Sequence, residues 1–175
     1  DGKEARSKKS LHIIKDLLSR YFVGLIFQIL ILFVIYTVVL LIFGIKNAVV
    51  IAFLCALLNL IPYIGPLIGA FLMVVLTMSS NLGASFSEVI LPKTTYVMIG
   101  FMIGQLVDNF FSQPFIFSKS VKSHPLEIFL VIIIGGLLFG VIGMITAVPS
   151  YTALKVIMKE FLSENKIVKE LTKNI

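Results

Sequence analysis

Four polar side chains follow one another at helical spacing in an otherwise apolar stretch: Gln105, Asp108, Asn109 and Ser112. Their intervals are i, i+3, i+4 and i+7, so all four would share one face of a helix. A carboxylate at the centre of a helix in a bilayer costs about 2.5–3.5 kcal/mol, which is tolerated where it faces a bundle interior, water or an ion. The spacing predicts a solute or cation site with Asp108 as its charged member. The alternative is that Asp108, near the end of its helix, only reaches interfacial water.

A second candidate lies where proline and glycine interrupt an apolar stretch over residues 48–78. The prolines delete backbone donors and disfavour helix before them, so we expect a broken helix or a re-entrant hairpin. Broken helices in membranes expose helix ends and carbonyl groups that transporters use as solute and ion sites. The alternative is a plain kink satisfied by neighbouring helices. The residues assigned to this candidate site are Asn59, Pro62, Tyr63, Gly65 and Pro66.

Glycines recur at the four-residue spacing that lets helix backbones approach closely in lipid. Packing within one chain and packing between subunits are equally compatible with this pattern. The helix-packing glycines are the pairs Gly65/Gly69, Gly100/Gly104 and Gly136/Gly140, with Gly135 and Gly143 beside the last pair.

Patterns typical of an enzyme are missing from the sequence. It has no phosphate-cradling glycine loop, no nucleophile elbow and no paired Cys/His spacing for a metal. Its single cysteine, Cys55, lies in an apolar run, and its two histidines, His12 and His124, are far apart. We therefore expect no catalytic residue, no metal ion and no cofactor.

The composition assigns the chain to membrane proteins. Of its 175 residues, 58% are hydrophobic and only 14% are charged, and the mean hydropathy is +1.05. A soluble domain is about 45–50% apolar and about 25% charged, and one of this size could not bury so much apolar surface. Soluble domains, disordered tails and nucleic-acid modules are excluded. Basic residues gather in both flanks, where they suit anionic lipid heads better than nucleic acid.

The elements that must position these residues form an all-α, polytopic transmembrane helical bundle. We expect a basic amphipathic lead-in over residues 1–20, a transmembrane domain over 21–150 and a C-terminal amphipathic cytoplasmic helix over 151–175. In that last helix Leu154 and Ile157 fall opposite Lys155 and Lys159. The expected spans are 21–43, the interrupted 48–78, 93–111 and 126–148, with loops over 79–92 and 112–125 and with Pro149 closing the last span.

Basic residues at both ends place both termini in the cytoplasm, which requires an even number of crossings, and four is the simplest number. If residues 48–78 form a true hairpin, the later spans invert.

Several stretches resemble the autoinducer-2 exporter (AI-2E) family of bacterial membrane proteins. The most specific is Asn59-Leu-Ile-Pro-Tyr-Ile-Gly-Pro-Leu-Ile-Gly69. Others follow in the order of the family's C-terminal half, so we expect an N-terminal half to be absent here. They are Gln105-Leu-Val-Asp-Asn109 with Pro114 after it, Val121-Lys-Ser-His-Pro-Leu126, Gly135-Gly-Leu-Leu-Phe-Gly140 and Gly143-Met-Ile-Thr-Ala-Val-Pro149.

The resemblance implies a polytopic transporter of the bacterial inner membrane that forms a homo-oligomer. The family's named substrate is the signalling molecule autoinducer-2, while some members are assigned sodium/proton antiport, and a shared fold does not fix the substrate. Three hypotheses follow. The first is an exporter of a small polar solute, the second is an antiporter that uses Asp108, and the third is a non-transporting scaffold built on the glycines. The expected partners are the lipid bilayer, a small polar solute or cation, and further copies of the chain.

Overall fold

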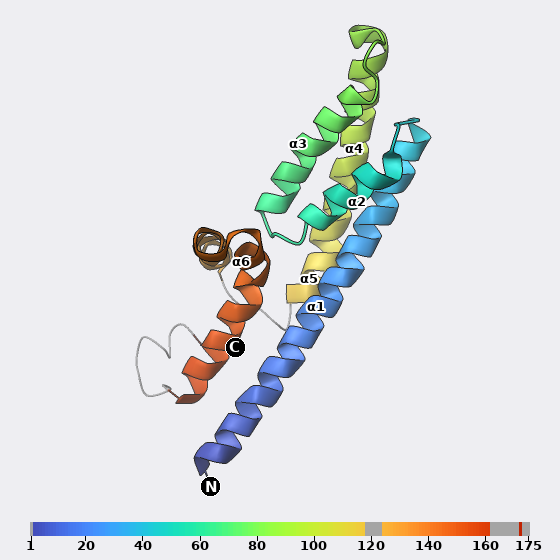
Figure 1. Cartoon of the computed structure of the whole chain (residues 1–175). Helices are drawn as coiled ribbons and strands as arrows, with labels where there is room; N and C mark the ends of the chain where they lie inside the picture. The colour runs from blue at the N-terminus through green and yellow to red at the C-terminus, as the bar shows by residue number, and fades with distance from the viewer. Residues whose placement is uncertain (1, 118–123, 162–171, 173–175) are drawn as a thin grey trace. The chain divides into compact units, whose positions relative to one another are not determined.

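The chain folds into helices connected by turns, as the composition predicts (Figure 1). This computed structural model describes residues 2–117, 124–161 and 172, and they contain no strand. The all-helical fold is therefore confirmed. The helices are α1 (Gly2–Ile42), α2 (Ala48–Leu58), α3 (Ile64–Ser79), the π-helix η1 (Phe86–Ile90), α4 (Leu91–Val107), the π-helix η2 (Asp108–Ser112), α5 (Gln113–Phe117) and α6 (Pro125–Phe161).

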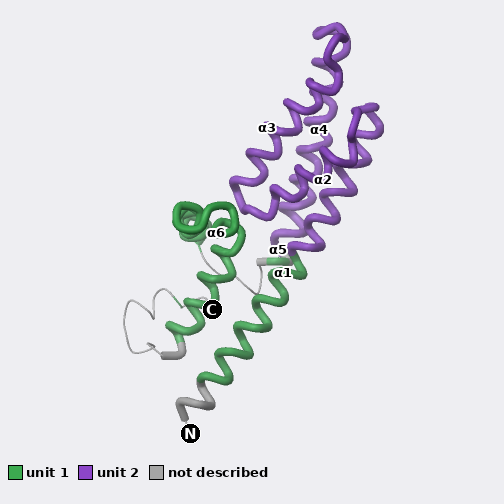
Figure 2. The backbone as a smooth tube through the Cα atoms, viewed as in Figure 1, with its two compact units in different colours: residues 1–24, 115–175 green, residues 25–114 purple. Residues whose placement is uncertain are grey.

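The chain divides into two compact units (Figure 2). Unit 1 comprises residues 1–24 and 115–175, and unit 2 comprises residues 25–114. Helix α1 is continuous through residues 20 and 21, where the lead-in was expected to end. The division into a lead-in, a transmembrane domain and a C-terminal helix stays a prediction, and most of residues 162–175 lie outside the described part.

Unit 2 is a bundle of four helical segments around one apolar core. Leu32, Tyr36 and Leu40 are fully buried at four-residue intervals along α1, so they form one stripe of that helix. The stripe packs against core residues of the other segments, which are Ala48, Ile51, Ala52, Cys55 and Ala56 of α2, Met73 of α3, and Val97 and Phe101 of α4. This core holds together the helices that carry the polar residues.

Helices α2 and α3 form a hairpin around the predicted interruption. Helix α2 ends at Leu58 and α3 begins at Ile64, and between them Tyr63 has a φ of 64°, which is strained for a residue with a side chain. The arms approach closely: a Cβ atom on Gly65 would collide with the Leu58 carbonyl. Proline chemistry thus explains the break, and glycine allows the close return.

Two expected loops are shorter than predicted, because helix continues through a proline in each. Residues 86–90 are already helical, and Pro92 follows their π-turn as the second residue of α4. After α4, the helix continues through η2 into α5 and ends at Phe117. The wider π-turn of η2 accommodates Pro114, whose ring would collide with the preceding turn of a regular helix. Residues 118–123 lie outside the described part.

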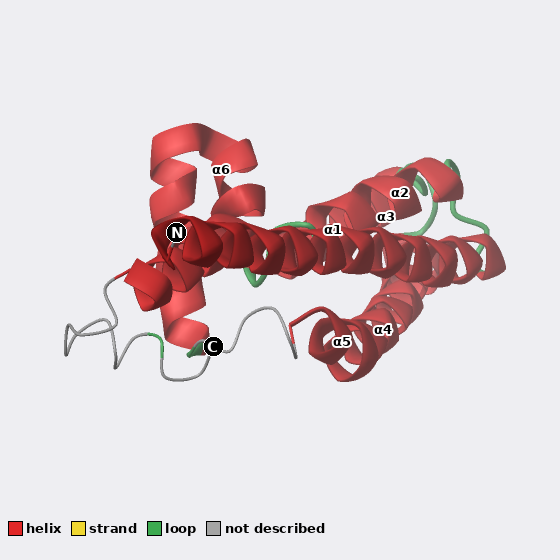
Figure 3. Cartoon of the chain, turned by 90° about the horizontal axis from the view of Figure 1, so that it is seen from below, coloured by secondary structure: helices red, strands yellow, loops and turns green. Residues whose placement is uncertain are grey.

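Helix α6, in unit 1, is a hairpin instead of the straight span expected over 126–148. Figure 3 shows α6 turning back on itself. Gly140 has a φ of 63° and a ψ of −146°, which is non-helical and suits glycine alone. The two arms touch backbone to backbone, since a Cβ on Gly135 would lie 2.6 Å from the Gly143 carbonyl oxygen. Pro149 does not close the helix, which continues to Phe161. The expected stop at proline is therefore wrong, and the break occurs at glycine.

A buried ion pair joins the two arms of α6. Lys155 Nζ lies 2.9 Å from Glu127 Oε1, and the lysine side chain is only 3% exposed. The Tyr151 hydroxyl donates a hydrogen bond to the same carboxylate, and Lys155 lies 4.9 Å from the centre of the Tyr151 ring. The amphipathic pattern had placed Lys155 on the polar face, but it is buried, while Leu154 is 51% exposed. An opposite charge 28 residues away explains the reversal.

We expect Lys155→Met to lower the free energy of unfolding by about 3 kcal/mol, because it leaves the Glu127 carboxylate without its cation. Thermal melting in detergent, followed by circular dichroism, measures the loss. The double variant Glu127→Gln/Lys155→Met should be more stable than Lys155→Met alone. A single variant that melts with the wild type would contradict this role.

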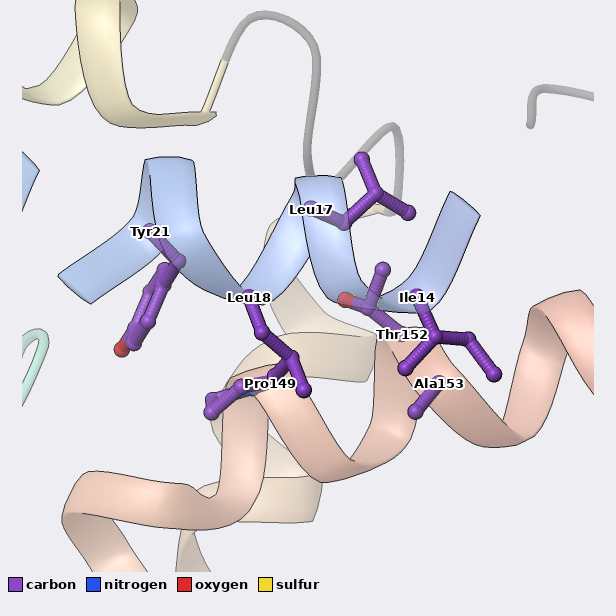
Figure 4. A pocket seen from close by; sticks show the side chains of 7 residues that line it. All are labelled: Ile14, Leu17, Leu18, Tyr21, Pro149, Thr152 and Ala153. Atoms are coloured by element: carbon purple, nitrogen blue, oxygen red, sulfur yellow. The ribbon is translucent and has the colours of Figure 1, made fainter. Parts of the chain in front are cut away.

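The first half of α1 packs against the second arm of α6 within unit 1. Figure 4 shows the apolar pocket at this contact, lined by Ile14, Leu17, Leu18 and Tyr21 of α1 and by Pro149, Thr152 and Ala153 of α6. Ile14 and Leu18 lie one helical turn apart, so both reach this contact from the same face of α1, while Leu11 on that face is 69% exposed.

Three helical stretches among the described residues are long and apolar enough to cross a bilayer: Ser7–Ile42, Phe86–Ser112 and Pro125–Lys159. The arms α2 and α3 are shorter apolar helices. A helix of 11 residues rises about 16 Å, which is far less than the roughly 30 Å of a hydrocarbon core. The four-crossing topology stays a prediction.

Candidate functional site

The centre of the candidate site is the carboxylate of Asp108, which is 1% exposed inside unit 2. It begins the π-helix η2, and π-turns within helices occur often at functional sites. Gln28 of α1 donates a hydrogen bond from Nε2 to Asp108 Oδ2 at 2.8 Å, and Gln113 of α5 donates to the same oxygen at 3.2 Å. Two neutral amides therefore hold one oxygen of a buried acid.

The other carboxylate oxygen, Oδ1, is buried and accepts no hydrogen bond of normal geometry from a described residue. The nearby hydroxyl of Ser112 is also buried, and it too forms no hydrogen bond of normal geometry with a described residue. Neither of the two ion pairs recorded among the described residues involves Asp108. Because a buried charge is costly unless it is paired, this arrangement suits a proton or a cation that comes and goes.

A second group of polar side chains lies one turn earlier on α4. Gln105 Nε2 donates to the Tyr36 hydroxyl oxygen at 2.7 Å and to Asn59 Oδ1 at 3.0 Å. Asn59, at the end of α2, in turn donates from Nδ2 to the Cys55 carbonyl at 3.0 Å. Tyr36 stacks on Phe101 with ring centres 5.1 Å apart. Gln105 thus connects α1, α4 and the helix interruption.

The structure brings together only part of the predicted site. Asn59, Gln105, Asp108 and Ser112 are buried in unit 2, so both candidate sites contribute to one polar cluster. Asn109 is exposed and accepts a hydrogen bond from Gln113 at 2.8 Å. The predicted common face therefore holds for Gln105, Asp108 and Ser112, while Asn109 lies at its exposed edge.

The remaining predicted path residues lie outside this cluster. Tyr63 is 45% exposed, Pro114 is exposed, and Pro62 and Pro66 are half-buried at the hairpin turn. Gly65 is buried where the two arms meet.

Sequence analysis missed Gln28, Tyr36 and Gln113 as members of the cluster. Gln28 carried a usable signal: it is the strongly polar side chain of an apolar span, and it falls on the same stripe as Leu32. Polar residues inside membrane helices face the bundle interior. Tyr36 and Gln113 gave no comparable signal, because tyrosine is common in apolar spans and Gln113 lay in an expected loop.

Except for Gly140, the predicted packing glycines lie at helix contacts inside this one chain. A Cβ on Gly104 would approach the Tyr36 ring to 2.7 Å, and Gly100 faces the Val39 side chain, so both bring α4 close to α1. Gly136 packs against Met144 within the α6 hairpin. Gly69 has ordinary contacts, and Gly140 is the hinge of α6.

Comparison with known proteins shows what kind of protein carries this cluster. The family model described as AI-2E family transporter matches residues 2–163. The chain belongs to the AI-2E family. This membership confirms the resemblance seen in the sequence. Together with the three long apolar helices, it identifies a multi-pass membrane protein of a transporter family.

Two AI-2E relatives come from Bacillus subtilis (strain 168). The chain is 35% identical over 157 residues to the "Putative transport protein YrrI", which covers 90% of this chain and 42% of the relative. It is 33% identical over 153 residues to the "Putative transport protein YueF", which covers 84% of this chain and 38% of the relative. The chain therefore spans less than half the length of these relatives. No solved structure matches it significantly.

Proposed function

We propose that the chain supplies the polar path of a membrane transporter, with Asp108 as its charged group. One observation carries the proposal: Asp108 is buried in unit 2, held by two glutamine amides, with no cation beside it among the described residues. A carboxylate in this setting costs free energy of folding. Such residues mark the pathways of transported solutes, ions or protons in membrane proteins.

The proposed cargo is a small polar solute that is exported, as the family name suggests. Gln105, Asn59 and the Tyr36 hydroxyl offer amide and hydroxyl groups that could exchange their mutual hydrogen bonds for bonds to a solute. Such groups recognise a small polar molecule, the class of cargo to which the family's named substrate, autoinducer-2, is assigned here. Tyr63 and the proline-flanked turn of the hairpin would line the entrance, and Asn109 and Pro114 would lie at the far end.

Sodium/proton antiport is the alternative that the geometry of Asp108 favours. An antiporter needs an acid that binds a proton and a cation in turn, and a buried carboxylate with one oxygen that accepts no described hydrogen bond meets that need. The polar amides around it would help to coordinate a hydrated or partly hydrated sodium ion. Both functions use the same cluster, and they differ in whether the charge itself is required.

The proposal places the protein in the bacterial inner membrane with both termini in the cytoplasm, as a homo-oligomer without a cofactor. A non-transporting scaffold is the remaining hypothesis, and it predicts that substitutions at Asn59, Tyr63 or Asp108 leave every flux unchanged. Under that hypothesis Gly136→Leu would still disrupt assembly.

Flux through proteoliposomes that contain Gln105→Leu tests the proposal. Leucine keeps the approximate volume of Gln105 but leaves the Tyr36 hydroxyl and the Asn59 carbonyl without their partner, a loss of about 1–3 kcal/mol. We expect autoinducer-2 efflux to fall about tenfold or more, as measured by release from loaded vesicles.

Thr95→Val is the matched control on the same helix. Thr95 is exposed and bonds only to its own helix, at the Leu91 carbonyl, so its flux should equal that of the wild type. Wild-type efflux no higher than that of empty vesicles would argue for the scaffold. Unchanged efflux in Gln105→Leu would contradict the role of Gln105, and equal losses in both variants would argue for a general defect of α4.

A further inference from the structure

The wide end of the α2–α3 hairpin contains an open cavity of about 520 Å³. It lies within unit 2, away from the closed end of the hairpin, where the Cys55 thiol approaches the Gly69 carbonyl oxygen at 3.7 Å. The lining residues divide into two kinds. Lys46, Asn47, Ser79 and Ser80 are polar, whereas Val50, Ile51, Leu54, Leu76 and Leu82 are apolar.

The polar part of the lining lies where a membrane interface would be. Lys46 follows the end of the apolar stretch Ser7–Ile42 by four residues, and its backbone N–H donates to Ser80 Oγ at 2.9 Å. This hydrogen bond connects the turn before α2 to the turn after α3, so the two turns lie at the same depth relative to a membrane. One helical turn or more further along α2, Val50 and Leu54 face the cavity at the depth of acyl chains.

Positive charge gathers at this mouth. Lys46 is exposed and forms none of the ion pairs recorded among the described residues. A second lysine, Lys93, donates to Asn81 Oδ1 at 3.4 Å, so it lies beside the same turn. The acid of this region, Glu88, is in the first turn of η1 and lies outside the cavity lining. Lysine beside an anionic membrane surface attracts acidic headgroups.

We propose that the α2–α3 cavity is a binding site for an anionic phospholipid, with its phosphate at Lys46 and an acyl chain between the helices. The two-part lining matches an amphiphile in the orientation that the bilayer imposes. A small polar solute would fit poorly, because the apolar inner part of the cavity, at Val50, Leu54 and Leu76, offers it no hydrogen bonds. The site is distinct from the Asp108 cluster, so it does not depend on the proposed cargo.

Native mass spectrometry of the detergent-purified full chain tests this inference. The probes are phosphatidylglycerol and phosphatidylcholine with identical acyl chains, and inorganic phosphate serves as a headgroup-only competitor. We expect the wild type to retain phosphatidylglycerol, phosphatidylcholine to be lost more easily, and phosphate to displace neither. Lys46→Gln should weaken phosphatidylglycerol retention about fivefold, the effect of one lysine near an anionic surface.

Two further variants separate the cavity from general charge. Lys15→Gln removes an exposed lysine of α1 in unit 1, so it should leave retention unchanged. Leu54→Trp fills the apolar part and should reduce retention while Lys46 stays in place. Three results would overturn the inference. They are equal retention of the two lipids, equal effects of Lys15→Gln and Lys46→Gln, and a second copy of the chain bound in place of lipid.

Discussion

Under the antiporter hypothesis, Asp108→Asn should abolish proton-coupled sodium exchange in proteoliposomes while leaving the bundle folded. Asparagine has nearly the same shape and still offers an acceptor oxygen to Gln28 and Gln113, so the buried hydrogen bonds survive. What is lost is the charge and the exchangeable proton. Because asparagine cannot bind and release a proton, we expect exchange to fall to the level of vesicles without protein.

The two transport hypotheses give different outcomes in the same vesicles. A pH-sensitive dye inside them reports sodium-driven proton release, and autoinducer-2 efflux is measured in parallel. Asp16→Asn is the matched control, because Asp16 is an exposed carboxylate paired with Arg20 at 3.2 Å and lies outside the cluster. If Asp108→Asn exported solute at the wild-type rate and the wild type showed no cation exchange, the antiporter hypothesis would be wrong.

Gly143→Ala should open the α6 hairpin. The added Cβ would lie well inside the van der Waals contact distance of the Gly135 carbonyl oxygen, and 2.8 Å from Phe139 Cβ. Backbone atoms on both arms cannot give way as a flexible side chain can, so the arms must separate. Overpacking of this kind costs about 1–3 kcal/mol or more. We expect the melting temperature in detergent to fall by several degrees, as measured by circular dichroism.

Gly69→Ala is the control for this prediction. Its Cβ would lie 3.7 Å from the Cys55 carbonyl oxygen and from the Phe101 ring, which are ordinary contacts, and alanine favours helix over glycine. It should melt at or above the wild-type temperature. Equal destabilisation by the two substitutions would mean that glycine packing in general, and not the backbone contact in α6, sets stability.

Local signals predicted some breaks in the helices and missed others. The two prolines and the glycine around Tyr63 predicted the α2–α3 interruption, because proline removes donors wherever it falls. Pro92, Pro114 and Pro149 carry the same chemistry but did not end helices. Pro92 and Pro114 each follow a π-turn and Pro149 lies in a hairpin arm, so whether the helix continues depends on the neighbouring backbone geometry. The break at Gly140 was not predicted, because the glycine spacing alone does not show that Gly135 and Gly143 pack against each other across a hairpin.

Sequence alone determined that this is an all-helical membrane protein with an acid inside an apolar helix and with an interrupted helix; the structure decided that the acid is buried. These properties follow from composition and from helical spacing, which act over a few residues. Only the tertiary structure decided that Gln28 meets Asp108 across 80 residues and that Lys155 meets Glu127 across 28. A buried polar group needs a partner, but its spacing along the chain does not say which one. That choice is made when the apolar stripes of distant helices pack, because packing brings whatever polar residues lie on those stripes into contact.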